Sequence, residues 1–332
     1  MIGLPGLILD DSTSDLIENH GINNFILFSR NIDTPEQLRR LCTALHHHCR
    51  YHHLPPPLIA IDQEGGTVAR LPSPWTRFPD ARTLAESPHP ETAVREYATI
   101  CAKELLDVGI NFNLAPVLDV SPANCNYFME RRSFSGNPLQ VATLGNLIIS
   151  NMQQEGVAAC GKHFPGLGLA RLDPHLTLPR VDRPRSEVIS HDLPPFRAAI
   201  RAEVAAIMTS HTIHPGLDSE LPATLSHSIL TELLRGELGY NGLIITDDLE
   251  MGAIANEKKV AEAAVMAFNA GADLLLICKD HDKIRDTLTT LDKARKHGTI
   301  SDKAVKTALG RINHVRHQFP LPPRFQTGPL GP

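Results

Sequence analysis

Eight short apolar runs, each separated from the next by a longer segment of helical character, constrain the fold of this 332-residue sequence more than any other feature. Continuous apolar runs of this length are typical of strands buried on both faces, as in parallel sheets. The expected strands span residues 6–9, 25–28, 58–61, 112–118, 157–160, 205–208, 243–245 and 274–277. The expected helices span residues 35–48, 90–108, 138–155, 186–202, 226–238, 257–270 and 280–296. This alternation predicts an α/β fold, either a closed barrel or a doubly wound sheet.

The residues that follow the expected strands distinguish these two folds. Each run ends at polar or ionisable residues, namely Asp10, Arg30, Asp62, Asp119, Lys162-His163, His211, Asp247-Asp248 and Lys279. In a barrel these positions converge on one mouth, where barrel enzymes place their chemistry. A doubly wound sheet usually has a glycine-rich phosphate loop after its first strand, whereas residues 10–13 here read Asp-Asp-Ser-Thr. The sequence therefore predicts a single (β/α)₈ TIM-type barrel over residues 1–318.

Composition and the two ends of the chain indicate which binding partners and which cellular location to expect. The formal net charge of −5 and the pI of about 6.4 argue against a nucleic-acid partner or an anionic membrane surface. The N-terminus resembles neither a signal peptide nor a membrane span. Six scattered cysteines are typical of reduced thiols, so we expect a cytoplasmic protein. Residues 319–332 are rich in Pro and Gly, which predicts a mobile tail.

A histidine-rich run at residues 46–53 offers imidazole and thiolate groups that are good metal ligands. Consecutive residues of a helix point in different directions, however, and do not converge on one ion. We therefore interpret the run as the end of the helix that begins near Pro35, with its polar side in solvent, and expect no metal site.

Asp247 is the first candidate for chemistry because it follows the seventh expected strand, residues 243–245, after Thr246. A carboxylate on a rigid strand tip can attack the anomeric carbon of a sugar and form a covalent intermediate. The alternative is that Asp247 and Asp248 cap the helix that follows. We favour capping for Asp248 alone, because side-chain direction alternates at a strand end.

The segment from Lys162 to His175 carries several further candidates. Lys162 and His163 follow the fifth strand and could donate hydrogen bonds to sugar hydroxyls. Asp173 and His175 are two residues apart, so their side chains share a face in extended backbone. A carboxylate can fix the tautomer of an imidazole and raise its pKa, as a general acid/base requires. The pattern alone leaves open a surface turn with an incidental Asp and His.

Asp62 and Arg70 follow the third strand around the pair Gly65-Gly66. Asp62 could accept hydrogen bonds from sugar hydroxyls, and Arg70 could donate them. The alternative is a strand-to-helix turn in which Asp62 caps a helix, and this motif by itself does not decide between the two.

Four motifs together resemble the bacterial NagZ-type β-N-acetylglucosaminidases of glycoside hydrolase family three. They are Asp62-Gln63-Glu64-Gly65-Gly66, Lys162-His163-Phe164-Pro165-Gly166, Asp173-x-His175 and Thr246-Asp247-Asp248-Leu249. The resemblance runs from about residue 3 to about residue 315. It implies a single (β/α)₈ domain without the second domain of many β-glucosidases of that family, and it implies no cofactor.

The resemblance also implies a retaining two-step reaction. Asp247 would be the nucleophile, and His175, paired with Asp173, would be the acid/base. The family's sugar-contacting positions match Asp62, Arg70, Arg132, Lys162 and His163. His211 would line the same mouth, or would be a structural histidine. The implied substrate is a terminal β-linked N-acetylglucosamine on a muropeptide fragment in peptidoglycan recycling. Separately, we expect the protein to be a monomer.

One departure from the family stands in the loop between Gly166 and Gly168, where Leu167 replaces a histidine. Because Asp173 and His175 remain, we expect the chemistry to survive while loop packing or leaving-group preference changes. Arg131 offers a second basic candidate beside Arg132, and we assign the sugar contact to Arg132 because it directly precedes Ser133-Phe134.

The sequence leaves other functions open. Phosphate could replace water as acceptor in a phosphorylase, or a β-glucosidase or β-xylosidase could use the same scaffold. A metal-dependent barrel hydrolase could use Asp62, His163, His211 and Asp247 as ligands, although Lys162 would repel a cation. A non-catalytic sugar-binding barrel is the remaining alternative.

Overall fold

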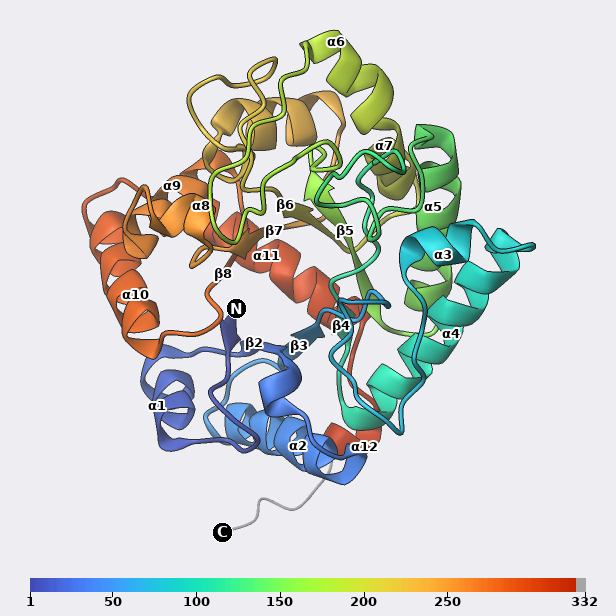
Figure 1. The fold of residues 1–332 in the computed structure, drawn as a ribbon. Helices are drawn as coiled ribbons and strands as arrows, with labels where there is room; N and C mark the ends of the chain where they lie inside the picture. Colours follow the sequence, from blue (N-terminus) through green and yellow to red (C-terminus); the bar gives the residue numbers. More distant parts are fainter. Residues whose placement is uncertain (327–332) are drawn as a thin grey trace.

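Eight parallel strands form the barrel that the sequence predicts. The computed structural model describes residues 1–326. The strands follow one another around the sheet in chain order, and every neighbouring pair is parallel. A bridge between Ile2 and Ile277 joins the two ends of the sheet and closes the barrel at the centre of the molecule (Figure 1). The strands are β1 (Ile2–Gly3), β2 (Asn24–Leu27), β3 (Leu58–Ile61), β4 (Phe112–Asn113), β5 (Ala158–Phe164), β6 (Ala206–Thr209), β7 (Leu243–Asp248) and β8 (Leu274–Leu276).

Helices surround the strands (Figure 1). The longer ones are α1 (Asp11–His20), α2 (Pro35–Tyr51), α4 (Pro90–Val108), α5 (Pro138–Gln154), α7 (Pro194–Arg201), α9 (Val260–Ala270), α10 (His281–Lys296) and α11 (Asp302–Gln318). The short ones are α3 (Ala81–Ala85), α6 (Arg185–Glu187), α8 (Gly252–Ala255) and α12 (Pro323–Gln326), with 3₁₀ turns at Ser29–Asn31 and Ala223–Leu225 and π-helical segments at Val188–Asp192 and Ser228–Glu237. Local sequence sets several boundaries, because Pro begins α2, α4, α5 and α7, where the missing N–H costs nothing.

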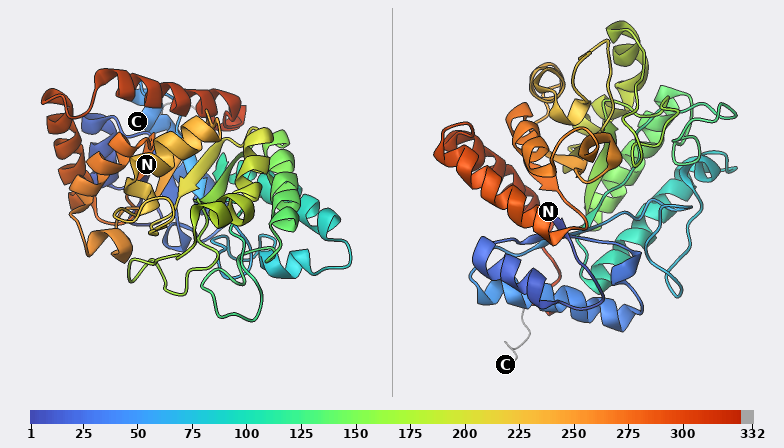
Figure 2. Two further views of the ribbon diagram at one scale, coloured as in Figure 1. Left: turned by 90° about the horizontal axis from the view of Figure 1, so that it is seen from above. Right: turned by 60° about the vertical axis from the view of Figure 1, so that its left-hand side comes forward.

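The core has two layers that follow the alternation of side chains along each strand. In β3, Leu58 and Ala60 belong to the barrel interior, whereas Ile59 and Ile61 pack in the layer between strands and helices. Residues of α11, together with Phe319, complete the interior cluster. Figure 2 shows α11 at the opposite end of the barrel from the long loops that follow β4 and β5. The end at which the strands terminate is therefore the end left for a binding site.

The first strand is the one predicted strand that was misplaced. β1 is Ile2–Gly3, whereas residues 6–9, the expected strand, form a loop in which Ile8 is exposed. Ile2 pairs with Phe25 on one side and with Ile277 on the other, so this earlier apolar pair occupies the place in the barrel. Asp10 accordingly does not end a strand. Its side chain accepts a hydrogen bond from the backbone N–H of Thr13 and caps α1.

The first residues of the expected tail, from Phe319 to Phe325, are part of the packed domain. Phe319, Leu321 and Phe325 are buried, and α12 lies against α2. Residues 327–332, the rest of the expected tail, lie outside the described residues. Across residues 1–326, no helix combines the length and apolar character needed to cross a bilayer.

The histidine-rich run lies at the end of α2, as predicted, and the helix ends at Tyr51. His46 is buried rather than turned to solvent, and burial lowers its pKa to about 4. Within the described part of the chain, no group of three or more His, Cys, Asp or Glu side chains is arranged to hold a metal ion.

Candidate active site

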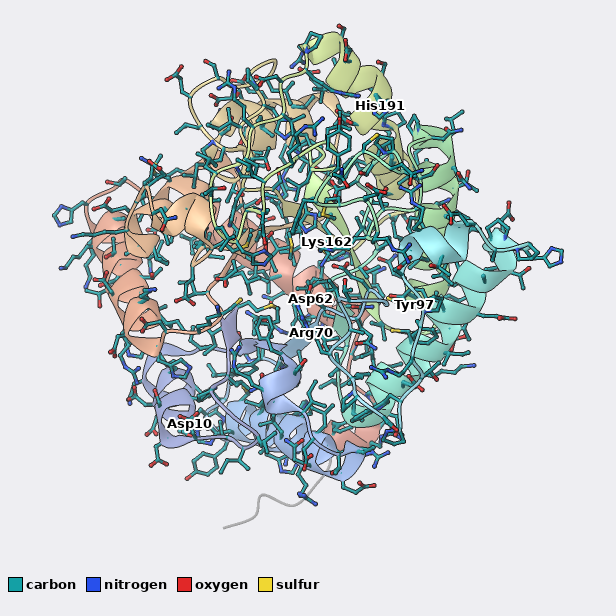
Figure 3. All side chains as sticks on the ribbon, in the orientation of Figure 1. Asp10, Asp62, Arg70, Tyr97, Lys162 and His191 are labelled. Atoms are coloured by element: carbon teal, nitrogen blue, oxygen red, sulfur yellow. The ribbon has the colours of Figure 1, made fainter. Side chains whose placement is uncertain are left out.

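A cavity of about 310 Å³ opens where the strands end. Seven of the nine residues predicted for the site line this cavity: Asp62, Arg70, Arg132, Lys162, His163, His175 and Asp247. Figure 3 shows three of them, Asp62, Arg70 and Lys162, close together at the centre of the barrel. The two exceptions are Asp173, which lies behind His175, and His211. Of the strand-end residues named from the sequence, Asp10, Asp119 and His211 do not line the cavity. The others do: Arg30, Asp62, Lys162, His163, Asp247, Asp248 and Lys279.

Asp62 and Lys162 form the centre of the cavity floor. They extend from the ends of β3 and from β5, and the Lys162 Nζ donates to Asp62 Oδ1 at 2.8 Å. Arg70 donates to the other carboxylate oxygen of Asp62 at 3.1 Å. The alternative in which Asp62 caps a helix does not hold, because both of its oxygens take side-chain cations.

Glu64, which is not among the predicted site residues, extends these contacts into a network. Its carboxylate accepts two hydrogen bonds from Arg132, at 2.9 and 2.7 Å, and pairs with Lys162 at 2.7 Å. We call Asp62, Glu64, Arg70, Arg132 and Lys162 the ion-pair network. The spacing of Asp62 and Glu64 offered a signal, since residues two apart in extended backbone share a face. Arg131, by contrast, pairs with Asp80 outside the cavity, so Arg132 is the one that lines it.

Electrostatics favour the charged forms of Asp62, Glu64 and Lys162 in the ion-pair network. Burial opposes the ionisation of Asp62, but the positive charges of Lys162 and Arg70 outweigh it and hold the pKa of Asp62 well below its usual range. Burial likewise opposes the ionisation of Glu64, and Arg132 and Lys162 lower its pKa to about 2. The pKa of Lys162 is raised, because Asp62 and Glu64 outweigh the cost of burying its ammonium group. The floor thus presents fixed donors and acceptors to a ligand at any physiological pH.

Asp247 stands on β7, with 19% of its side chain exposed. One of its carboxylate oxygens accepts the backbone N–H of Asp248 at 2.8 Å. The other lies 4.0 Å from Nε2 of His163, across the cavity floor. A carboxylate held in this way keeps one oxygen available to a ligand.

Asp119 orients His163 and was missing from the predicted site. Its fully buried carboxylate lies 2.8 Å from Nδ1 of His163 and accepts the backbone N–H of Leu167 at 2.5 Å. A hydrogen bond to one ring nitrogen fixes where the other points. Asp119 followed the fourth strand in the sequence, so its place at the mouth was visible there, although its partner was not.

Asp248 also lines the cavity, which differs from the expectation that it would point elsewhere. The pairing of β7 with β8 shifts register between Ile245 and Asp248, so simple alternation of side chains ends there. Asp248 accepts the backbone N–H of Glu250 at 3.1 Å and does not cap α8, whose N-cap residue is Met251. Burial, with the negative charges of Glu250 and Asp247, raises the pKa of Asp248 to about 6.

Asp173 and His175 meet on the long loop between β5 and α6. Nδ1 of His175 lies 2.6 Å from Oδ1 of Asp173, and the same oxygen accepts the backbone N–H of His175 at 2.8 Å. The side chain of His175 is 60% exposed and that of Asp173 is 36% exposed. The ring of Phe128, which also lines the cavity, lies 6.3 Å from that of His175. The two residues form a pair whose Nε2 is free to face a ligand.

Leu167 occupies the position at which the sequence departs from the family pattern. It is buried in a small apolar cluster with Val117, Met129, Ala170 and Val181. Its backbone N–H still bonds to Asp119. The leucine therefore packs the start of the loop, just after β5, against this cluster. The Asp173–His175 pair still forms.

His211 lies below the cavity and does not line it. Its Nε2 donates to the backbone carbonyl of Asp248 at 2.9 Å, because a carbonyl can only accept, and its Nδ1 lies 2.8 Å from the hydroxyl of Thr224. Burial lowers the pKa of His211. Of the two interpretations of this residue, the structural one matches its contacts: it holds the end of β7 in place.

Together these residues offer a carboxylate on a strand tip, an imidazole–carboxylate pair on a loop, and a fixed array of hydrogen-bond donors and acceptors between them. This combination suits a hydroxyl-rich ligand whose reacting carbon lies between Asp247 and His175.

Known proteins resemble this chain over most of its length. The β-hexosaminidase of Alkalilimnicola ehrlichii is 39% identical over 296 residues, which cover 88% of this chain and 83% of that protein. A glycoside hydrolase family 3 β-N-acetylglucosaminidase structure from Paenibacillus superposes with a TM-score of 0.92 at 37% identity. That match covers 99% of this chain but only 62% of the Paenibacillus chain.

A smaller relative matches over nearly its whole length. The structure of NagZ from Neisseria gonorrhoeae in complex with N-trifluoroacetyl-D-glucosamine has a TM-score of 0.78 and 29% identity, covering 96% of this chain and 97% of that one. Residues 4–315 match the family described as the glycosyl hydrolase family 3 N-terminal domain. The chain described here belongs to glycosyl hydrolase family 3.

Proposed function

We propose that this protein is a retaining exo-β-N-acetylglucosaminidase, with Asp247 as nucleophile and His175, held by Asp173, as acid/base. One observation carries the proposal: a single cavity is lined by the strand-tip carboxylate and by the imidazole of a loop-borne pair. The names of the relatives, a β-hexosaminidase and a β-N-acetylglucosaminidase, support N-acetylglucosamine as the sugar. The volume of the cavity, about 310 Å³, is at the small end of the range for ligand sites, which suits one terminal sugar.

In the first step, a carboxylate oxygen of Asp247 attacks C1 of the sugar and the glycosidic C–O bond breaks. The leaving oxygen takes the Nε2 proton of the His175 imidazolium, so the aglycone departs as a neutral alcohol. Oδ1 of Asp173, 2.6 Å from Nδ1 of His175, accepts the Nδ1 proton in a hydrogen bond and stabilises the imidazolium. The products of this step are a glycosyl ester on Asp247 and a neutral His175.

In the second step, the neutral His175 removes a proton from a water molecule. The resulting nucleophile attacks C1 and releases the carboxylate of Asp247, so two inversions give net retention. A histidine suits this role because neither its protonated nor its neutral form adds a second negative charge beside the Asp247 carboxylate.

The ion-pair network binds the sugar in this proposal. Its residues are already charged and mutually oriented before a ligand arrives, so little reorganisation is needed on binding. Asp62 accepts from hydroxyl groups, and Arg70, Arg132 and Lys162 donate to hydroxyl or carbonyl oxygens. His163, fixed by Asp119, lies between this network and Asp247.

The biological setting is part of the same proposal. The substrate is a small carbohydrate, and the proposed one is β-linked N-acetylglucosamine on muropeptide fragments in peptidoglycan recycling. All six cysteines lie within the described residues and are free thiols, which supports a cytoplasmic location. A monomeric state is part of the same proposal.

Trapping the intermediate tests the proposal. A fluorinated N-acetylglucosamine donor with an activated leaving group is expected to leave a covalent adduct on Asp247, located by peptide mass spectrometry. Asp247→Asn is expected to lower turnover of dinitrophenyl N-acetylglucosaminide by about 10³-fold or more and to form no adduct. An adduct on another residue would refute the assignment. Faster turnover of glucosides or xylosides, or dependence on added phosphate, would change the substrate or the acceptor.

A further inference from the structure

The short helix α8 contacts the tip of the loop that carries His175. The backbone N–H of Gly252 donates to the carbonyl of His175 at 3.1 Å, and that of Ala253 donates to Pro174 at 3.1 Å. The side-chain amide of Asn256 donates to the carbonyl of Leu176 at 3.0 Å. Three consecutive loop residues are therefore bonded to one helical turn.

These contacts use groups that α8 cannot satisfy itself. The first N–H groups of any helix have no partner within the helix, and here the loop carbonyls accept two of them. Gly252 also leaves the space that the loop needs. A Cβ atom at this position would lie 2.8 Å from the His175 carbonyl oxygen and 2.7 Å from that of Leu176. The glycine does not adopt a left-handed conformation, so its role concerns space and not backbone freedom.

The position of α8 in the chain links the two catalytic groups. β7 ends at Asp248, one residue after Asp247, and α8 begins four residues later at Gly252. One continuous segment thus presents the carboxylate and holds the loop of the imidazole. The side chain of His175 has few protein contacts of its own, since it is 60% exposed.

We propose that Gly252 and Asn256 are positioning residues that set His175 at the right distance from the nucleophile. This inference rests on the proposed function. Neither residue touches the reacting atoms; both act through the backbone of residues 174–176.

Gly252→Ala is the main test, because the added methyl group meets only loop backbone. We expect kcat for methyl N-acetylglucosaminide, which needs a proton on its leaving oxygen, to fall by about 10- to 100-fold, since displacements near 1 Å have such effects. For the dinitrophenyl glycoside, which leaves without protonation, we expect a first-step rate within about threefold of the wild-type rate. Asn256→Ala, at an exposed position, should show the same pattern at about two- to tenfold.

Two controls separate the possible outcomes. Gly310→Ala adds a methyl group with no neighbour within 4 Å and should change neither rate. His175→Ala should show the same leaving-group dependence more strongly. Equal losses on both substrates in Gly252→Ala and Asn256→Ala, or no loss in either variant, would overturn the positioning role while His175→Ala still responds. A His175→Ala variant that loses both activities equally would instead overturn the proposed acid.

Discussion

The floor of the cavity and the loop that carries His175 are built in opposite ways. On the floor, the side chains of Lys162 and Glu64 are 2% and 7% exposed and are held by charge pairs. On the loop, the side chains of His175 and Asp173 are 60% and 36% exposed. The loop is held by backbone hydrogen bonds to α8 and by the packing of Leu167.

This difference separates two tasks. A sugar is recognised by many weak hydrogen bonds, and these gain most from groups that are already charged and oriented. A proton donor and acceptor must exchange protons with substrate and water, so it needs access to both. The strand ends supply the rigid groups, whereas the loop brings the exposed Asp173–His175 pair to them.

The contrast predicts that substitutions in the cavity floor lower the free energy of unfolding more than substitutions in the loop do. Lys162→Met preserves the shape of the side chain but leaves Asp62 and Glu64 buried beside fewer positive charges. We expect the free energy of unfolding to fall by about 3–5 kcal/mol, as for other buried ion pairs that lose one member. Urea titration followed by circular dichroism measures the change.

Lys279→Met is the matched control for Lys162→Met. Lys279 lines the same cavity but is exposed, so its loss should alter stability by less than about 0.5 kcal/mol. If the two variants were equally stable, the ion-pair network would not be what holds the floor together.

The sequence predicted which residues form the cavity floor better than it predicted the contacts among them. The eight apolar runs predicted the barrel, and the barrel placed Asp62, Lys162 and Asp247 at one mouth. The sequence did not predict that Glu64 joins Lys162 to Arg132, because Arg132 lies 68 positions further along the chain. Contacts of this kind depend on the path of a long loop, which no local pattern encodes.

Two further differences between the predicted and the observed structure have physical causes of the same kind. β1 was misplaced because two neighbouring apolar stretches both fit a short strand, and only pairing with Phe25 and Ile277 selects Ile2–Gly3. His211 stands at a strand end, yet hydrogen bonds to Thr224 and Asp248 turn it away from the cavity. In both cases tertiary contacts decide between locally equivalent alternatives.

A second carboxylate of the cavity, Asp248, sharpens the contrast, because its pKa is shifted in the direction opposite to that of Asp62. Burial raises the pKa of Asp248 from 3.8 to about 6, so the folded protein favours its protonated form. The stabilisation that results is complete below about pH 4 and is lost as the pH rises through about 6. Asp248→Asn removes this titration. We therefore expect the free energy of unfolding of the variant, relative to that of the wild type, to rise by about 2 kcal/mol as the pH increases from 4 to 7.

Unfolding of both proteins at a series of pH values measures this gain. The ion-pair network behaves oppositely, because the lowered pKa values of Asp62 and Glu64 contribute stability that is lost only as the pH falls toward about 2. Both proteins retain that network, so it cancels in their difference. A difference in stability that stayed constant from pH 4 to pH 7 would show that Asp248 ionises normally.

The smallest effect on stability is expected in the loop. Asp173→Asn keeps the size of an exposed side chain and an oxygen that can accept the backbone N–H of His175, so the free energy of unfolding should change by less than about 0.5 kcal/mol. The amide cannot stabilise an imidazolium as the carboxylate does, and we expect kcat for the methyl glycoside to fall by about 10- to 100-fold. Turnover and urea unfolding on the same preparations check both expectations. The effect belongs to the proton donor only if the dinitrophenyl glycoside is spared in its first step. A fall in stability as large as that of Lys162→Met would mean that the loop, like the floor, is held by its charges, and the division between the two regions would be lost.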